Sequence, residues 1–379
     1  MAPALTSTAA TSITPAPVAA PAASVAPAQA AAPTIHGYIW EQPAILAGIL
    51  ENREALAAPF AELYDRIRPD RLYLVASGSS LNAAAAAVPL MEEALGIEAT
   101  PAPPSNMPPI RGQRPLVVFV SQEGRSTNIL AAMERLSGRP MAVVVSREDS
   151  PAGLRCPARV PLACGDELVG PKTKGYAATV LTLYMLALSC APRAEAWLEP
   201  LRAAVALLPG NIRAAEAWVE RAAPELKRMS KCAVVGKGAA AIAAREGALK
   251  LQETIHVAAA AYDFEEFLHG PACALDAGYA GLYLLPDETD PDAARVRGMI
   301  EWHRRIGSPV FAAGGWQPPG GGGLDCAARM TGAWHADIFA RMLPCQMAAA
   351  KIPAMLGIQD EKMLDFQRMD AELGIKAKC

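Results

Sequence analysis

The sequence lacks several features that mark other classes of protein. Its 379 residues carry no excess of one charge, because 35 Lys and Arg face 38 Asp and Glu and leave a formal net charge of -3. A chain without a basic field does not offer the surface that nucleic acid or an anionic membrane requires. Its eight cysteines form no CxxC pair, and its five histidines form no HExxH pair. We therefore predict buried, reduced thiols, no metal, no cofactor and a cytoplasmic location.

The first 36 residues contain no Lys, Arg, Asp or Glu and are rich in Ala, Pro, Thr and Ser. A secretory signal needs a basic start and a continuous apolar run, and a mitochondrial transit peptide needs arginines. We therefore predict that residues 1–36 form a disordered extension. The most apolar stretch, residues 174–193, is interrupted by Thr179, Thr182 and Ser189. It is too polar for a membrane span and predicts a buried core helix.

Short aliphatic runs alternate with helix-length segments along the rest of the chain. Residues 71–76, 115–120 and 141–146 form one series of such runs, and residues 232–235, 280–285 and 309–313 form a second. Continuous apolar strands separated by helices predict parallel βαβ crossovers and a doubly wound sheet. We therefore predict an α/β protein of two such lobes with flanking helices.

The two series look like copies of one unit. LYLVASGSS at residues 72–80 and CAVVGKGAA at residues 232–240 each place a strand, a small-residue turn and an Ala-rich helix in order. Only the first copy keeps the hydroxyl groups, which predicts an anion site in lobe 1 and a supporting or catalytic role for lobe 2. We place lobe 1 at residues 37–207, a linker at residues 208–210 (LPG), lobe 2 at residues 211–356 and a tail at residues 357–379.

Two hydroxyl-rich turns follow predicted strands of lobe 1. Residues 77–80 (SGSS) include Ser79 and Ser80, and residues 121–127 (SQEGRST) open a second helix. Glycine permits close backbone approach, and a helix N-terminus offers N–H groups and a positive dipole end to a phosphate. Taken singly, such serines are more often helix caps. Because both turns lie at the carboxyl edge of one sheet, together they predict a ligand site.

Five segments in this order resemble the sugar isomerase (SIS) domain family, and more closely the isomerase part of glutamine-fructose-6-phosphate aminotransferase. They are ASGSSLNAA at residues 76–84, SQEGRSTNIL at 121–130, GDELVGPKTKGY at 165–176, EGALKLQE at 246–253 and EEFLHGP at 265–271. The resemblance spans roughly residues 41–356. It implies a fold of two SIS lobes, a sugar phosphate as ligand and a homodimer as the assembly.

The resemblance also implies which residues bind the phosphate. Ser80, Ser121 and Ser126 match the residues that hold it in the family. Gln122 assists them with nearby backbone groups, and Thr173 lies close by.

Three further residues match the family's catalytic groups. Glu253 matches the carboxylate that carries a proton between C1 and C2, and Lys250 lies one helical turn before it, matching a lysine near the sugar. His269 matches the histidine that assists ring opening, which often reaches the site from the neighbouring subunit. Interconversion of an aldose and a ketose needs a base over C1 and C2 and an acid on the ring oxygen. Outside such motifs, a lone Glu on a helix is usually solvated and a lone His is usually structural.

The chain departs at both ends from the full-length aminotransferase, called the synthase below. It has no N-terminal cysteine and no segment of the length of a glutaminase domain, so we do not expect it to make ammonia from glutamine. The synthase tail carries a catalytic lysine, and here Lys376 and Lys378 are the candidates to replace it. The resulting hypothesis is an isomerase, deaminase or deglycase of a ketose or amino sugar phosphate. The alternative is a non-catalytic sugar-phosphate sensor or scaffold.

Glu123 is the most informative departure, because relatives carry a phosphate-binding serine at this position of the motif. A carboxylate there repels a phosphate unless a cation offsets it. Lys172, which stands where relatives carry a serine, and Arg125 are the candidates for that cation. We predict that Glu123 and Lys172 form a paired replacement that selects a modified ligand, such as one with an amine or one without the usual phosphate. The alternative is that Glu123 points to solvent.

Overall fold

The computed structural model of the protein describes residues 34–358 and 361–377. Most of the predicted extension, residues 1–33, lies outside the described residues, as does Lys378. Helix α1, Ile35–Glu51, begins before the predicted end of that extension, with the Thr34 hydroxyl accepting a hydrogen bond from Gly37 N. Residues 35 and 36 are therefore helical, which corrects the predicted boundary.

Lobe 1 contains a parallel sheet of five strands in the order β2-β1-β3-β4-β5. The three predicted strands are present as β1 (Arg71–Ala76), β3 (Pro115–Val120) and β4 (Met141–Val145). The edge strands β2 (Glu98–Ala102) and β5 (Ala158–Pro161) were not predicted from the sequence. Both contain proline, which is tolerated at a sheet edge because no second neighbour needs its N–H.

Lobe 2 repeats this topology with a second parallel sheet, in the order β10-β9-β8-β6-β7. The predicted strands are β6 (Lys231–Gly236), β8 (Tyr279–Leu284) and β9 (Val310–Gly314). The missed strands are again at the edges, β7 (Ala258–Asp263) and β10 (Cys326–Ala327). In each lobe the first strand lies between the second and the third. The predicted fold class, two parallel-sheet lobes with flanking helices, is confirmed.

The copies also share their first turn. Gly78 and Gly238 precede α3 (Ser79–Leu95) and α7 (Ala239–Thr254) with φ values of 56° and 57°. A positive φ at this position favours glycine, which explains why both copies keep it.

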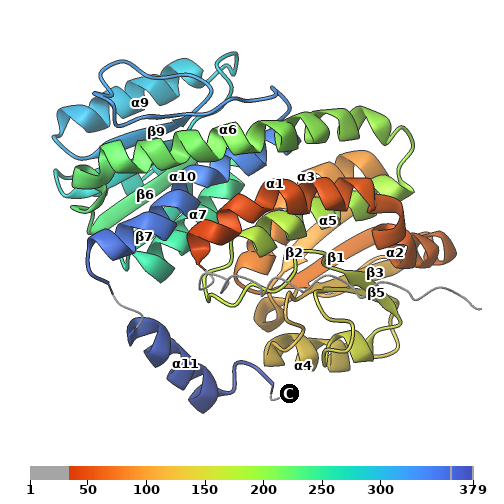
Figure 1. Ribbon diagram of the computed structural model, residues 1–379. Helices are drawn as coiled ribbons and strands as arrows, with labels where there is room; N and C mark the ends of the chain where they lie inside the picture. The colour runs from red at the N-terminus through yellow and green to blue at the C-terminus, as the bar shows by residue number, and fades with distance from the viewer. Residues whose placement is uncertain (1–33, 359–360, 378–379) are drawn as a thin grey trace, which may run out of the picture. The chain divides into compact units, whose positions relative to one another are not determined.

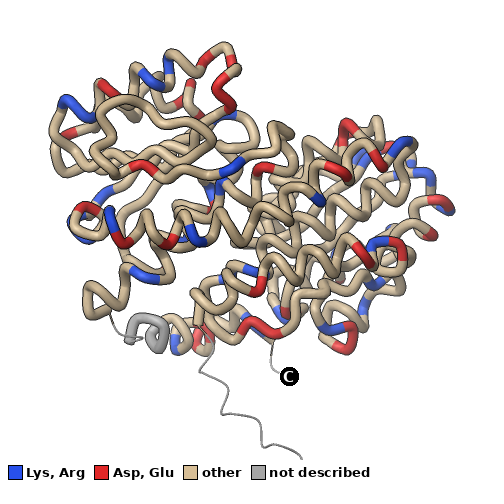
Figure 2. The backbone as a smooth tube through the Cα atoms, turned by 45° about the horizontal axis from the view of Figure 1, so that its top comes forward, with Lys and Arg blue, Asp and Glu red and all other residues tan. Residues whose placement is uncertain are grey.

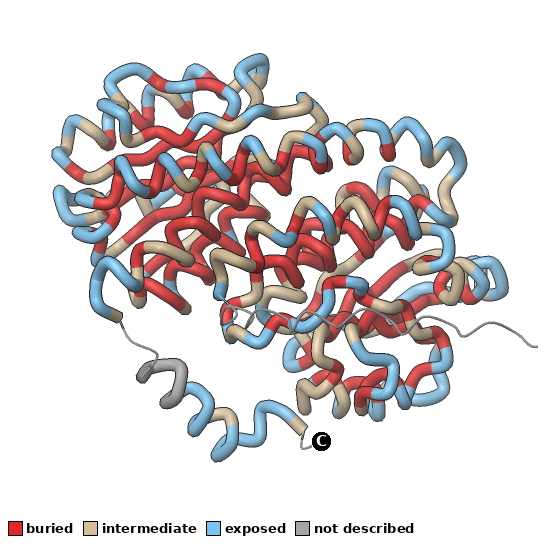
Figure 3. Tube along the Cα trace, in the orientation of Figure 1, coloured by how far each residue is buried: buried red, intermediate tan, exposed pale blue. Residues whose placement is uncertain are grey.

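Helices cover both faces of each sheet (Figure 1). In β1, Leu72 and Leu74 face a large core that also includes Leu282 of β8, whereas Tyr73 and Val75 face a separate outer core. The large core joins the lobes, because α3 packs against α7 as well as against α5. Figure 3 shows the burial of the strands and of these central helices. The remaining helices are α2 (Arg53–Ile67), α4 (Thr127–Arg135), α5 (Lys174–Cys190), α6 (Glu195–Leu226), α8 (Phe264–Leu268), α9 (Ala293–Arg305), α10 (Trp334–Met355) and α11 (Glu361–Leu373).

The predicted linker at residues 208–210 is wrong. These residues lie in the middle of α6, which continues through Pro209. Leu208 and Ile212 are fully buried, and α6 packs along α10. This packing outweighs the hydrogen bond that a proline removes from a helix.

The described helices, charges and cysteines bear on the other predictions from composition. The predicted core helix is α5, which is buried over most of its length. Among the described helices, none is both long and apolar enough to span a membrane. Figure 2 shows Lys and Arg interspersed with Asp and Glu along the chain. Five of the seven described cysteines are buried, but Cys273 is exposed, contrary to the prediction of buried thiols.

Candidate functional site

A pocket of about 980 Å³ lies at the carboxyl edge of the lobe 1 sheet. The loops after β3, β4 and β5 line it, together with the end of α7 and part of α11 and the tail. This is the edge at which open α/β folds bind ligands. Four of the predicted site residues line the pocket: Gln122, Glu123, Lys172 and Glu253.

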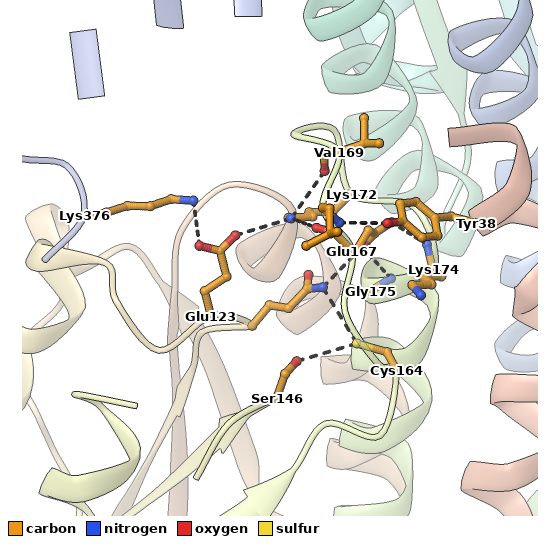
Figure 4. A network of polar contacts seen from close by, with 12 residues as sticks. Tyr38, Glu123, Ser146, Cys164, Glu167, Val169, Lys172, Lys174, Gly175 and Lys376 are labelled. Carbon is orange, nitrogen blue, oxygen red and sulfur yellow. Dashed lines mark hydrogen bonds and ion pairs between the residues drawn. The ribbon is translucent and has the colours of Figure 1, made fainter. Parts of the chain in front are cut away.

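Glu123 lies between two ammonium groups (Figure 4). Its Oε1 is 3.3 Å from Lys172 Nζ, and its Oε2 is 2.8 Å from Lys376 Nζ. Burial raises the pKa of Glu123, but the two lysines outweigh burial and hold this pKa below its usual value. The predicted pair of Glu123 and Lys172 is therefore present, while the Glu123 side chain stays 38% exposed. Its role in selecting the ligand stays a prediction. Arg125 forms no ion pair with Glu123 among the described residues, and its guanidinium donates instead to the carbonyl of Ala377.

The tail after α11 pairs with the loop before α4. Ser126 and Lys376 form an antiparallel bridge, and Ala377 N donates to Arg125 O at 2.8 Å. Thr127 N and its hydroxyl donate to Ile375 O. This pairing brings Lys376 to the pocket, at a place that no motif in the sequence indicated.

Glu167 caps the N-terminus of α5. Its Oε1 accepts from Thr173 N at 2.7 Å and from Lys174 N at 3.1 Å, and its Oε2 accepts from Gly175 N at 3.1 Å. Gln122 Nε2 also donates to Oε2, at 3.2 Å. Thr173 and Gln122 thus both contact Glu167, a residue that was not predicted to belong to the site. Its position in GDELVGPKTKGY, six residues before Thr173, was the only signal.

Replacing Glu167 by Ala is expected to lower the free energy of unfolding by about 2–4 kcal/mol, since three backbone N–H groups lose a charged acceptor. Urea unfolding of the purified protein measures this change. Asp166→Ala is the matched control, because Asp166 is an exposed neighbour on the same loop, and a change within about 0.5 kcal/mol is expected there. Equal stability of the two variants would contradict the role of Glu167.

Glu253 lines the pocket from the end of α7, and Lys250 pairs with its carboxylate. Lys250 Nζ is 2.5 Å from Glu253 Oε2, 3.3 Å from Glu246 Oε1 and 3.2 Å from Ser79 Oγ. Lys250 and Glu246 are both fully buried. Burial lowers the pKa of Lys250, but its two carboxylate neighbours outweigh burial and raise it. Burial raises the pKa of Glu246, while Lys250 and Asn82 partly offset this effect.

The predicted serines and His269 lie apart from the pocket wall. Among the described residues, Ser79, Ser80, Ser121 and Ser126 do not line it. Ser79 contacts Lys250 instead, and Ser121 is buried. His269 is exposed at the end of α8 and is also absent from the wall.

His256 lines the pocket and was missed from the sequence. It follows α7 with a φ of 61°, a left-handed backbone that is uncommon for a residue other than glycine. Residues in such conformations cluster at functional sites. Its place three residues after Glu253 was the available signal.

These features define a two-lobed chain with the fold of the phosphosugar isomerases. Its pocket is lined by Glu253, the carboxylate of the EGALKLQE segment. The resemblance to the SIS family is confirmed by comparison with known proteins. The chain is 28% identical over 261 residues to glutamine–fructose-6-phosphate aminotransferase [isomerizing] of Gloeobacter violaceus. The match covers 63% of this chain and 42% of that relative, so the chain spans less than half of its relative's length. No protein-family model matches the sequence.

Solved structures show the same fold. A protein of Clostridium difficile 630, proposed to be a phosphosugar isomerase, superimposes with a TM-score of 0.77 at 24% identity, over 86% of this chain and 93% of that one. Glucosamine-6-phosphate deaminase of Thermotoga maritima superimposes with a TM-score of 0.64 at 20% identity, over 83% and 96%.

Proposed function

We propose that the chain is an enzyme that moves a proton between C1 and C2 of a ketose or amino sugar, as an isomerase, deaminase or deglycase. The observation that carries this proposal is the position of Glu253, which lines the pocket while the buried Lys250 holds its other side. Relatives named as an isomerizing aminotransferase and as a deaminase support a role of the sugar-phosphate isomerase type. The proposal concerns the end of the substrate that carries C1 and C2.

The chemistry requires one base and one acid. Glu253 takes a proton from C1 or C2 and returns it to the other carbon, so no oxidant or reductant is needed. Lys250 Nζ lies 2.5 Å from Glu253 Oε2 and holds this carboxylate in place. His269 of a partner subunit is the proposed acid for ring opening, and His256 and Lys376 also line the pocket on this chain.

Isomerase, deaminase and deglycase differ in the group that leaves. An isomerase releases none, whereas in the other two reactions water replaces an amine at the carbon that carried it. A volume of about 980 Å³ lies near the upper end of the range for pockets that hold drug-sized ligands. This space accommodates a substituent on the nitrogen and thus supports a deglycase as well as a deaminase.

The test is incubation of the purified protein with ketoses, amino sugars and fructosamines, each with and without a phosphate. Mass spectrometry follows the products and deuterium uptake from heavy water at C1 and C2, and an ammonia assay follows deamination. Deuterium uptake without a leaving amine identifies an isomerase. Saturable binding without uptake or products would favour the sensor hypothesis instead.

A shared site is a further expectation. We predict that the active form is at least a dimer and that His269, exposed at the end of α8, reaches the site of the partner. Mixing inactive Glu253→Gln and His269→Ala chains is expected to restore activity, because one site of a mixed dimer then holds both intact residues. Two differently tagged Glu253→Gln chains are the control. No recovery after subunit exchange, verified by co-purification of the tags, would count against sharing.

A further inference from the structure

The pocket around Glu253 is lined by more acidic than basic residues. Within the described chain, its wall carries six carboxylates (Glu123, Asp149, Asp166, Glu167, Glu253 and Asp370) and four cations (Arg125, Arg147, Lys172 and Lys376). Four positive and six negative groups give a formal charge of -2 with His256 neutral. The wall is therefore of mixed charge with a small negative excess, and Lys250, outside the wall, pairs with Glu253. Such an excess attracts anions less than it attracts neutral groups or cations. The field of this wall therefore disfavours a phosphate dianion.

The cation nearest to the replaced serine is already used by the protein. Lys172 Nζ donates to Glu167 O at 2.6 Å and to Val169 O at 3.4 Å, in addition to its ion pair with Glu123. An ammonium group has three N–H groups, and those of Lys172 all face protein oxygens. Lys172 therefore fixes Glu123 in place rather than binding an anion of the ligand.

Two helix N-termini beside the pocket, those of α4 and α5, donate to internal oxygens, and only that of α4 was predicted to attract an anion. The other predicted N-terminus, that of α3, begins at Ser79 and Ser80, which are not among the described residues of the pocket wall. At α4, Thr127 N donates to Ile375 O of the tail at 3.0 Å. At α5, the N–H groups of Thr173, Lys174 and Gly175 donate to Glu167. Internal oxygens thus occupy backbone donors that bind phosphate at other helix N-termini.

The charges of Glu123 and Lys376 also favour a neutral ligand group beside them. At equal distances, the repulsion between Glu123 and a phosphate cancels the attraction of Lys376. A sugar hydroxyl carries no such cost, because it can donate to Glu123 and accept from Lys376. An amine is less suitable than a hydroxyl, since Lys376 lies 2.8 Å from the same carboxylate.

We infer that the substrate's far end, remote from C1 and C2, is an unphosphorylated polyol whose hydroxyls are bound by Glu123 and Lys376. The carboxylate of Glu123 takes the place of the ligand's phosphate as the partner of both lysines. This inference deepens the proposed function and rests on it, because it takes the pocket of Glu253 as the sugar site.

Isothermal titration calorimetry at constant ionic strength tests this inference. The probes are glucosamine with glucosamine 6-phosphate, fructose with fructose 6-phosphate, and inorganic phosphate. For the full-length wild type, the unphosphorylated member of at least one pair is expected to bind more tightly by about tenfold or more. Glu123→Ser is expected to gain about tenfold or more in affinity for the phosphorylated member and for inorganic phosphate. Glu123→Gln removes the charge at constant size and is expected to change in the same direction.

Glu220→Ser is the matched control, because Glu220 also pairs with a lysine, Lys351 at 2.7 Å, but lies on α6 outside the pocket wall. Its affinities are expected to equal those of the wild type. Tighter binding of the phosphorylated members to the wild type would overturn the inference, as would binding of neither member of either pair. An unchanged preference in both Glu123 variants would overturn it too. If the protein turned over phosphorylated sugars alone, the proposed enzyme function would stand and this inference would fall. If it bound unphosphorylated sugars selectively but turned over no sugar, the inference on the ligand would stand and the proposed enzyme function would fall.

Discussion

Glu253→Gln is expected to lower turnover by about two to four powers of ten while the sugar still binds. The amide keeps the size of the side chain, but it cannot accept a proton from carbon. The measurement compares the initial rate and the deuterium uptake at C1 and C2, using the best substrate of the sugar panel, with the affinity from calorimetry.

Glu266→Gln is the control for this experiment, because Glu266 is exposed on α8 and is not part of the pocket wall. Its turnover is expected to match that of the wild type. If pure Glu253→Gln retained near-normal turnover, the proposed role of Glu253 as the base would be wrong. A joint loss of binding and turnover would instead indicate that Glu253 orients the sugar.

Lys250→Met is expected to lower the free energy of unfolding by about 3–5 kcal/mol, because it leaves a buried carboxylate without its cation. Lys250 and Glu246 are both fully buried, with 3.3 Å between Nζ and Oε1. Urea unfolding measures the loss. The double variant Lys250→Met/Glu246→Gln, which removes both charges, is expected to recover much of it.

The loss in Lys250→Met should also depend on pH. Burial already raises the pKa of Glu246 from its usual 4.5, and removal of the cation raises it further. An acid with a raised pKa in the folded state destabilises the fold as pH rises above its unfolded pKa. The difference from the wild type is therefore expected to be small at low pH and to grow as pH rises above about 4.5. A difference independent of pH would show that lost packing, rather than the unpaired charge, causes the destabilisation.

The central strands were predictable because their signal is local. Apart from Arg71, the runs at β1, β3 and β8 contain no charged residue, as is typical of strands buried on both faces, and their order defines two parallel sheets. The edge strands were not predictable: Ala258–Asp263 (AAAAYD) has an alanine run typical of helix, and Glu98–Ala102 contains a proline. Their pairing with β6 and β1 determines their conformation. The linker prediction failed for a related reason, since the LPG signal at residues 208–210 yields to the packing of α6 on α10.

The sequence by itself determined the two-lobed α/β fold and the presence of Glu253, Lys250, Glu123 and Lys172 in motifs, because strand pattern and motif spacing are local properties of the chain. Only the tertiary structure decided which of these groups meet. Glu123 and Lys376 are separated by 253 residues, yet the antiparallel bridge between Ser126 and Lys376 brings their side chains to 2.8 Å. Glu167 and Gln122 likewise meet across 45 residues at the N-terminus of α5. Charge pairing depends on distance in space and not on distance along the chain. The ion pairs around Glu123 were therefore found only in the folded structure.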